Sequence, residues 1–367
     1  MRFHLPALPG QPTLRSNSSC AYTQKIRRFS QMMTARGHEV FIYSGPEDDS
    51  SPTEHIVTYP LRLEPIDPGD LDAWAPHNER VVKQIRRRAE DDDLLLVPYG
   101  RCQESIARGL PTMRAVEYGI GYTGVFADFR VFESYAWMHA VAGWHAGRDG
   151  RDMNAEVGRA FDVVIPNYFD PDDFPAGDGD GGYLLFLARV TELKGIDAAL
   201  QVAHRTGRRL VVAGAGDYEL PGYAEGVGQV GPDRRAELLR GARALLAPTT
   251  YIEPFGGAAV EAMLCGTPVI TTDWGAYTET IQHGVTGYRC RTIGEMLWAS
   301  TVIEDLDRDA IRRYALANYS MDAVAPRYEA YFAQLATLDD AGWYSDWQGI
   351  ADLHRYGTIL EGNHADH

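Results

Sequence analysis

In the second half of the chain, short apolar runs alternate regularly with segments of helical periodicity. Four runs have the length and composition of buried strands, at 183–188, 210–213, 244–247 and 268–271. Helical patterns fill the intervals, for example at 196–206 and 234–240, and a further helix begins near Gly257. Strands that alternate with helices form parallel sheets, because each crossover helix returns the chain to the same edge. The pattern therefore predicts a doubly wound α/β domain.

The first half shows the same alternation less regularly. A helix is predicted over roughly 22–36 and a strand over 40–43, with Gly37 between them in the left-handed conformation that ends many helices. A charged helix around 78–90 precedes an apolar strand at 94–97. We therefore predict a second α/β domain in this half.

The linker between the two domains is predicted from composition. After a strand candidate at 161–165, the segment 166–182 is rich in Pro, Gly and Asp, which favour turns and irregular structure. The length of 367 residues also suits two domains better than one. We place an N-terminal domain at 1–168, a C-terminal domain at 169–325, and a C-terminal helix and tail at 326–367.

The charge of the chain argues against nucleic acid and anionic membranes as partners. The formal net charge is −16, and a uniformly acidic protein repels polyanions. Residues 1–170 contribute only −4, from 19 Lys and Arg against 23 Asp and Glu, so this half alone has room for a local basic surface.

Cysteine spacing and hydropathy help to predict the cellular compartment of the protein. The four cysteines form no C-x-x-C pair and no zinc-like cluster, so free thiols in a reducing cytosol are expected. No stretch reaches the ~18–20 apolar residues of a membrane span, and the N-terminus lacks the pattern of a signal peptide. These features predict a cytoplasmic protein without an integral membrane segment.

The most informative segment is 247–281, which follows a predicted strand at the sheet edge where ligands bind. Glu253 lies in this loop, and Gly256 and Gly257 let the backbone approach a ligand closely. The first amides of the next helix favour an anion such as phosphate, and Glu261 stands about one turn into that helix. Two carboxylates that flank free amides suit a sugar nucleotide, which has hydroxyls at both ends and phosphates between them. The alternative is a pair of solvated glutamates.

Three segments resemble the retaining group-1 glycosyltransferases. EPFGGAAVEAMLCGTPVI is similar to the E-x(7)-E signature of that family, and VIPNYFDPDDF resembles its interdomain motif. LARVTELKGIDAAL resembles its GR-x-x-x-x-KG loop, with Arg189, Lys194 and Gly195 in matching positions. The similarity covers roughly residues 160–290. It implies an α/β protein of GT-B fold, with two Rossmann-like doubly wound domains that face a central cleft. The resemblance also implies that the domain at 1–168 binds the acceptor and that the domain at 169–325 binds the nucleotide sugar.

The resemblance also implies roles for individual residues. Arg189 and Lys194 match the positions that bind the donor diphosphate, where cations offset the charge of the leaving group. Glu261 matches the residue that contacts the ribose hydroxyls, and Glu253 the one that contacts the donor sugar and helps to hold it for attack. The donor site is expected to include Phe255, Gly256 and Gly257. In the family a C-terminal helix crosses back onto the first domain, as 326–367 is expected to do here.

The first domain departs from the family pattern. The loop after its first strand keeps Gly10 but has Ser18 and Ser19 in place of a glycine pair. Their hydroxyls and amides suit a phosphate, although helix capping explains them equally well. Glu117 stands near the place of a frequent catalytic His, and His139 follows in an aromatic helix. A capped or solvated carboxylate and a packed imidazole are the alternatives.

These observations predict an enzyme that moves a sugar from a nucleotide-diphosphate sugar to an acceptor hydroxyl with retention of anomeric configuration. The acceptor is a sugar, a lipid-linked group, a small molecule or, less readily, a modified nucleic-acid base. A same-fold nucleotide-sugar epimerase and a non-catalytic sugar-nucleotide-binding protein are the rivals. No cofactor and no metal are expected, because the diphosphate would meet cations and a helix start. The acidic runs at 90–93 and 172–173 are expected to be solvated.

Overall fold

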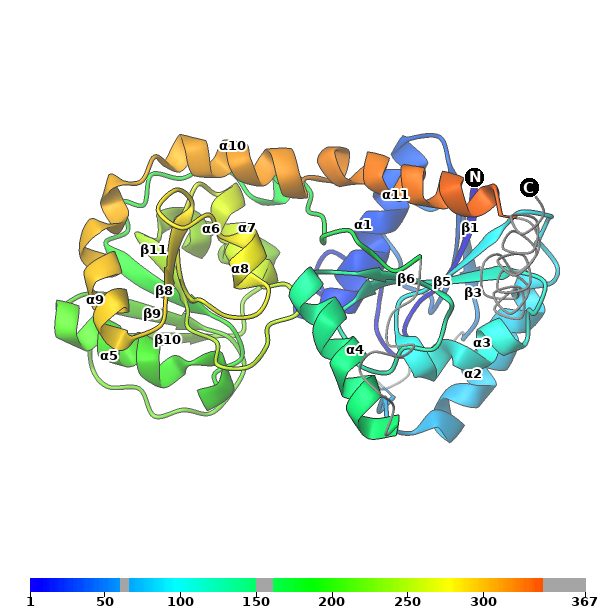
Figure 1. Cartoon of the computed structure of the whole chain (residues 1–367), viewed down its shortest axis with the longest axis horizontal. Coiled ribbons are helices and arrows are strands. Elements are labelled where there is room, and N and C mark those ends of the chain that lie inside the picture. Colours follow the sequence, from blue (N-terminus) through cyan, green and yellow to red (C-terminus); the bar gives the residue numbers. More distant parts are fainter. Residues whose placement is uncertain (60–65, 150–160, 339–367) are drawn as a thin grey trace, which may run out of the picture.

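The computed structural model describes residues 1–59, 66–149 and 161–338, which form two α/β domains side by side (Figure 1). The first domain has a seven-stranded sheet in the order β3-β2-β1-β4-β5-β6-β7. The second has a six-stranded sheet in the order β10-β9-β8-β11-β12-β13. The paired strands in both sheets are parallel. The expectation of two doubly wound α/β domains is thus confirmed.

The strands of both sheets are short. The first sheet contains β1 (Arg2–Pro6), β2 (Glu39–Ser44), β3 (Glu54–Val57), β4 (Leu94–Val97), β5 (Arg114–Ile120), β6 (Phe129–Phe132) and β7 (Val163–Val164). The second contains β8 (Tyr183–Leu187), β9 (Arg209–Ala213), β10 (Ala224–Gly228), β11 (Ala244–Ala247), β12 (Val269–Thr272) and β13 (Gly287–Cys290). The inner strands β4 and β8 are buried along their whole length, as expected where helices cover both faces of a sheet.

The helices follow the strands in alternation. Those of the first domain are α1 (Ala21–Ala35), α2 (Leu71–Ile85), α3 (Glu104–Arg108) and α4 (Tyr135–Asp149). Those after the linker are α5 (Ile196–Thr206), α6 (Pro232–Gly241), α7 (Gly257–Leu264), α8 (Tyr277–Thr280), α9 (Ile293–Val302), α10 (Arg308–Tyr319) and α11 (Met321–Ala336).

Two elements differ in extent from their prediction. The helix predicted around 78–90 is α2, which begins earlier, at Leu71. Asp70 allows the earlier start, because its side chain accepts a hydrogen bond from the Ala73 amide and caps the helix. The strand candidate at 161–165 shortens to the two residues of β7.

Both sheets reverse their direction of winding beside their first strand. β1 lies between β2 and β4, and β8 lies between β9 and β11. In doubly wound sheets, ligands bind at the carboxyl ends of the strands beside such a switch point. A site shared by the two domains is therefore expected at the loops that follow β1, β8 and β11.

The last two described helices return the chain to the first domain (Figure 1). α10 packs against α7, and α11 then runs over the first domain and contacts α1. The Phe332 ring of α11 is fully buried, 5.0 Å from the Phe3 ring of β1. Arg36 after α1 forms an ion pair of 2.7 Å with Glu329 of α11. α11 is thus part of the core of the first domain, and the tail at 339–367 lies outside the described residues.

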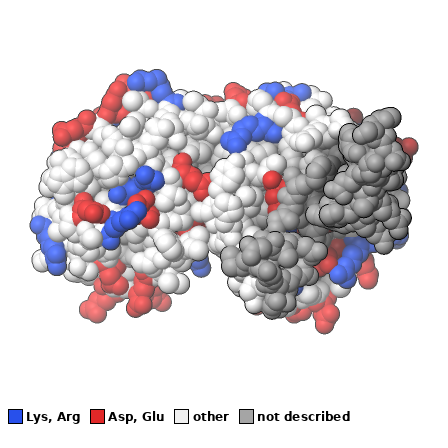
Figure 2. Space-filling view, viewed as in Figure 1, with Lys and Arg blue, Asp and Glu red and all other residues white. Residues whose placement is uncertain are grey.

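Surface charges of both signs are mixed on the face shown in Figure 2. Lys and Arg stand beside Asp and Glu on both lobes, and carboxylates also lie near the junction between the lobes. Among the described residues on this face, no continuous basic surface is formed. This face therefore offers no broad electrostatic footprint for a nucleic acid.

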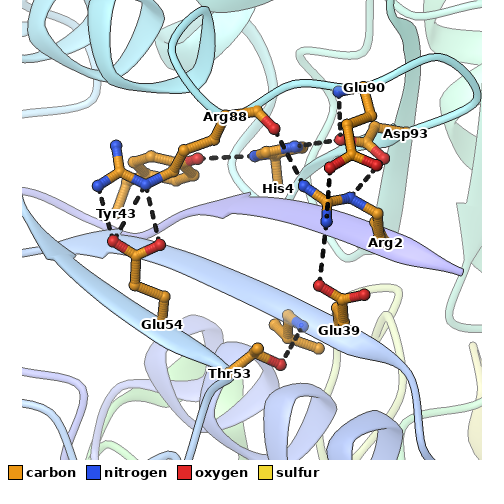
Figure 3. A network of polar contacts seen from close by, with 10 residues as sticks. Arg2, His4, Glu39, Tyr43, Thr53, Glu54, Arg88, Glu90 and Asp93 are labelled. Atoms are coloured by element: carbon orange, nitrogen blue, oxygen red, sulfur yellow. Dashed lines mark hydrogen bonds and ion pairs between the residues drawn. The ribbon is translucent and has the colours of Figure 1, made fainter.

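A polar network at the amino ends of β1 and β4 corrects one expectation (Figure 3). Asp93, from the acidic run expected to be solvated, is buried. Its carboxylate accepts a hydrogen bond of 3.0 Å from Arg2 and lies 2.8 Å from Nε2 of His4. The other His4 ring nitrogen lies 2.7 Å from the Tyr43 hydroxyl. Burial lowers the pKa of His4, although Asp93 opposes the shift. The prediction of a solvated run was wrong for Asp93, which ties β1 to the start of β4.

Candidate active site

A cavity of about 640 Å³ lies between the two domains, at the carboxyl ends of their strands. The loops after β1, β8 and β11 all contribute to it, as the strand order predicts. Of the candidate site residues, those that line the cavity are Ser18, Ser19, Arg189, Glu253, Phe255, Gly256, Gly257 and Glu261. The structure therefore brings most of the predicted donor residues together in one cleft.

The chain turns sharply into α7 at Gly256. This residue has φ of 82° and is the N-cap of the helix. A Cβ atom there would lie 2.4 Å from a ring carbon of Tyr277, so a side chain would both strain the backbone and clash. The preceding Phe255 is buried and stacks on Phe169, with ring centroids 6.3 Å apart. The turn is thus fixed so that Gly256, Gly257 and the start of α7 face the cavity.

Lys194 and Glu253 form an ion pair of 2.7 Å beside the cavity. Lys194 also lies over the Tyr251 ring, 4.8 Å from its centre. Burial would lower the pKa of Lys194, but the Glu253 carboxylate outweighs it and the pKa is raised. The loop needs Gly195 next to Lys194, because a Cβ atom there would meet the Pro248 carbonyl oxygen at 2.1 Å. Lys194 is thus held against Glu253, and of the two residues Glu253 lines the cavity.

Glu261 is held by a residue that the sequence did not indicate. Arg235 of α6 donates a hydrogen bond of 2.5 Å from Nε to the Glu261 carboxylate. Both side chains line the cavity, and Glu261 is buried. Only the proximity of α6 to α7 in the folded chain brings the two together, and no local motif marks Arg235.

The first domain contributes a second pair that the sequence did not indicate. Lys25 of α1 forms a buried ion pair with Glu133, which follows β6, and also donates to the Gly119 carbonyl oxygen. Both Lys25 and Glu133 line the cavity. A hydroxyl-bearing ligand on this side would meet a carboxylate and an ammonium group that already orient each other.

Ser18 and Ser19 lie beside this pair and do not cap α1. The N-cap residue of α1 is Cys20, and no side chain caps the helix by a hydrogen bond. The alternative of ordinary capping is therefore wrong, and both serines face the cavity.

Three candidates from the first domain lie outside the cavity. Gly10 has φ of 76° and lines a separate small hollow. Glu117 on β5 is fully buried, and its carboxylate accepts hydrogen bonds of 2.8 Å from the amides of Phe126 and Ala127. His139 is exposed on α4. A capped, buried carboxylate therefore describes Glu117 better than a site role, and His139 does not have the packed environment expected of it.

Several contacts hold the domains against each other across the cavity. Arg15, after β1, forms an ion pair of 2.6 Å with Asp173, so the linker run at 172–173 is not wholly solvated as expected. The Ser134 hydroxyl donates to the Pro254 carbonyl oxygen at 2.7 Å. Glu279 of α8 accepts hydrogen bonds of 2.9 and 2.7 Å from the first two amides of α4, so a carboxylate of the second domain caps a helix of the first.

Residues 172–313 match the family model of glycosyl transferases group 1. Over 85% of this chain and 92% of the relative, the sequence is 25% identical to a phosphatidyl-myo-inositol mannosyltransferase of Mycobacterium leprae. Among solved structures, a sucrose-phosphate synthase from Thermosynechococcus elongatus superposes with a TM-score of 0.69, at 17% identity, over 91% of this chain and 99% of that one. Anabaena HepE in complex with UDP and glucose gives a TM-score of 0.66, at 16% identity, over 91% of this chain and 100% of that one.

Fold and cavity together define a GT-B protein with a binding cleft between two Rossmann-like domains. Its segment 172–313 matches the group 1 glycosyl transferases, and the similarity identifies the chain as a glycosyltransferase. The likeness to solved structures concerns the fold alone. Within the described part of the chain, no helix combines the length and apolar character needed to cross a membrane.

Proposed function

We propose that this glycosyltransferase transfers a sugar from a nucleotide-diphosphate sugar to an acceptor hydroxyl. The observation that carries the proposal is the convergence of the Gly256–Gly257 turn, the start of α7 and two oriented carboxylates on one cavity. A helix start with glycines suits phosphate oxygens, and carboxylates suit sugar hydroxyls. The HepE structures, of the same fold, are described as complexes with UDP and with UDP-glucose, which makes UDP-sugars the first donors to test.

The proposed roles come from the resemblance, and the position of the residues in the cavity supports them. Glu261, held by Arg235, would accept hydrogen bonds from the ribose hydroxyls. Glu253, held by Lys194, would accept them from the donor sugar. Arg189 faces the cavity and would offset the charge that grows on the leaving diphosphate. The acceptor oxygen forms its bond to the anomeric carbon as the bond to the diphosphate breaks, and the hydroxyl proton passes to the departing phosphate oxygen. The resemblance to the retaining group-1 enzymes supports the proposal that configuration is retained.

The acceptor is proposed to bind on the side of the first domain, near Lys25 and Glu133. The mannosyltransferase relative is named for an inositol lipid, so an inositol or another polyol hydroxyl is a natural first trial. The mixed charge of the face in Figure 2 favours such an acceptor over a nucleic-acid base. Four free cysteines fit the further proposal of a cytoplasmic protein.

We propose that no metal ion or organic cofactor takes part. Arg189 and the positive end of α7 face the cavity, and a divalent cation there would be repelled by both. The carboxylates of the cavity are each paired with a cation, which reduces their capacity to hold a metal. An assay in excess EDTA tests this, and activity that is lost and then restored by Mg²⁺ or Mn²⁺ would contradict it.

The decisive experiment for function is a donor screen followed by product analysis. A donor at 100 times its Kd adds ~2.7 kcal/mol of stability, so thermal shifts with UDP-, GDP- and ADP-sugars identify the donor class. Glu261→Gln should weaken that binding about 10-fold and leave the unliganded melting temperature nearly unchanged. NMR of the product then reports the anomeric configuration. Interconversion of the donor without an acceptor would indicate an epimerase, and binding without transfer to any acceptor would indicate a sensor.

A further inference from the structure

The charged side chains that line the cavity are almost all paired with one another or with a neighbour. Each of the four carboxylates in the lining has a cationic partner, in the pairs Arg15–Asp173, Lys25–Glu133, Arg235–Glu261 and Lys194–Glu253. Two cations of the lining remain, Arg28 and Arg189. Within residues 1–59, 66–149 and 161–338, neither side chain forms a hydrogen bond or an ion pair, so neither guanidinium has a carboxylate partner of its own.

Arg28 reaches the cavity from α1, in the first domain. The residue is only 9% exposed, and its Nε atom has no hydrogen-bond partner among the described residues. Its guanidinium carbon lies 4.7 Å from the centre of the Phe169 ring, which in turn stacks on Phe255 of the donor loop. A buried Nε–H group without a partner is costly, because it loses water and gains no acceptor in return. Such a group is retained most readily where a ligand supplies the acceptor.

The surroundings of Arg28 place it at the nucleotide end of the cavity. Burial lowers the pKa of Arg28, and the charges that oppose this shift are on Glu261 and Asp173. Glu261 is the residue that the proposed function assigns to the ribose. An anion beside both Glu261 and Arg28 would therefore lie next to the ribose, where a nucleotide carries its phosphates.

We propose that Arg28 binds the diphosphate of the nucleotide-sugar donor from the first domain, opposite Arg189 of the second. The inference rests on the proposed function and adds a residue to it. The diphosphate of a sugar nucleotide carries two negative charges, which match the two cations that have no carboxylate partner of their own. The charge of Lys194 is already balanced by Glu253, so Arg28 supplies the second free positive charge that Lys194 was expected to supply. A guanidinium also suits phosphate better than an ammonium group, because its N–H groups can bind two oxygens at once.

This assignment makes the donor a bridge between the domains. Arg28 belongs to the helix that follows β1, and Arg189 to the loop that follows β8. A ligand that binds both arginines links the two domains across the cavity. The diphosphate itself would therefore help to hold the domains together, whichever acceptor is used.

Calorimetry on the full chain tests the proposal with UDP, GDP and ADP as probes, and with the nucleoside of the tightest one. Arg28→Met keeps the aliphatic stem and removes the charge. It should weaken nucleoside diphosphate binding about 10- to 100-fold, the loss of one charge-assisted group, and change nucleoside binding by less than about twofold. Arg28→Lys should recover part of the affinity. The matched control is Arg27→Met, because Arg27 is the neighbouring buried arginine but pairs with Asp49 and does not line the cavity.

The outcomes separate the alternatives. Unchanged diphosphate affinity in a folded Arg28→Met protein overturns the proposal, as does an equal loss for nucleoside and diphosphate, which would mean that Arg28 only shapes the cavity. A rise in KM confined to a phosphorylated acceptor would assign the anion to the acceptor and also overturn it. If Arg28→Met does not fold, Arg28→Lys decides by the same comparison of diphosphate and nucleoside. If the unmodified chain binds none of the three diphosphates, the proposed function itself fails, which is distinct from a failure at Arg28.

Discussion

Replacement of Glu117 by Gln is predicted to stabilise the protein above neutral pH. The carboxyl group is fully buried on β5, and burial raises its pKa from an ordinary 4.5 to about 7, although hydrogen bonds from Phe126, Ala127 and Tyr122 oppose the shift. In the folded protein it therefore holds its proton in a pH range where the unfolded chain has released it. The contribution of the protonated Glu117 to the free energy of unfolding is fully present below pH 4.5 and is lost as the pH rises to 7.

The size of the effect follows from that pKa difference. At about 1.4 kcal/mol for each pH unit, a shift from 4.5 to about 7 costs roughly 3 kcal/mol once both states are ionised. Glutamine does not ionise, and its amide can satisfy the same partners. In the unmodified protein the Phe126 and Ala127 amides both donate to the same oxygen of Glu117. The amide oxygen of glutamine can accept both of these hydrogen bonds, and its nitrogen can donate to the Tyr122 hydroxyl.

Urea unfolding of both proteins between pH 5 and pH 8.5 measures the difference. Glu117→Gln should gain about 3 kcal/mol over the unmodified protein at pH 8 and less than about 1 kcal/mol at pH 5. Glu79→Gln, at an exposed position on α2, controls for the loss of one charge. Parallel curves across this range would refute the reasoning. Because Glu117 lies outside the cavity, turnover should also survive the change, and a folded but inactive variant would restore Glu117 to the reaction.

Three further predictions concern separate parts of the fold. Burial lowers the pKa of His77 to about 4, so the contribution of the neutral imidazole to the free energy of unfolding is present above pH 6.5 and lost as the pH falls towards 4. The difference in free energy of unfolding between the unmodified protein and His77→Gln should therefore shrink by about 2 kcal/mol from pH 7 to pH 5 in urea unfolding. Phe332→Ala should cost about 3–5 kcal/mol by the same assay, because the ring is fully buried between α11 and the first sheet, and a loss below 1 kcal/mol would show that α11 is not part of that core. Glu279→Ala removes the carboxylate that caps α4 and should weaken the contact between the domains by about 1 kcal/mol. Small-angle scattering of the variant without ligand should show a larger radius of gyration, and an unchanged profile would count against this contact.

The sequence allowed the second domain to be predicted more fully than the first. Its four inner strands, β8, β9, β11 and β12, are short apolar runs bounded by turn residues, whereas β10 and β13 are not apolar runs and were not predicted. Its donor residues stand within single loops. Glu253, Gly256 and Glu261 could be placed in one site because a strand end, a glycine turn and a helix start follow each other directly in the chain. Residues this close in the chain stay close in the folded protein, so their placement in one site could be predicted without knowledge of the tertiary structure.

Two ion pairs of the cavity could not be predicted, because their members come from separate parts of the chain. Arg235 reaches Glu261 from another helix, and Lys25 reaches Glu133 across 108 positions. Each pairing depends on the order of the strands and on helix packing, neither of which leaves a local pattern. The acidic run at 90–93 shows a different error. The run was predicted to be solvated, but Asp93 is buried beside His4.

The position of α11 has a consequence for the order in which the protein can be made. The first domain leaves the ribosome first, yet its core includes side chains of Met321–Ala336. Until those residues emerge, the aromatic cluster around Phe3, Phe29 and Tyr118 lacks the helix that covers it. A nascent first domain therefore exposes apolar surface throughout synthesis of the second, and it is open to association with chaperones during that interval. The domain that begins folding first is completed last.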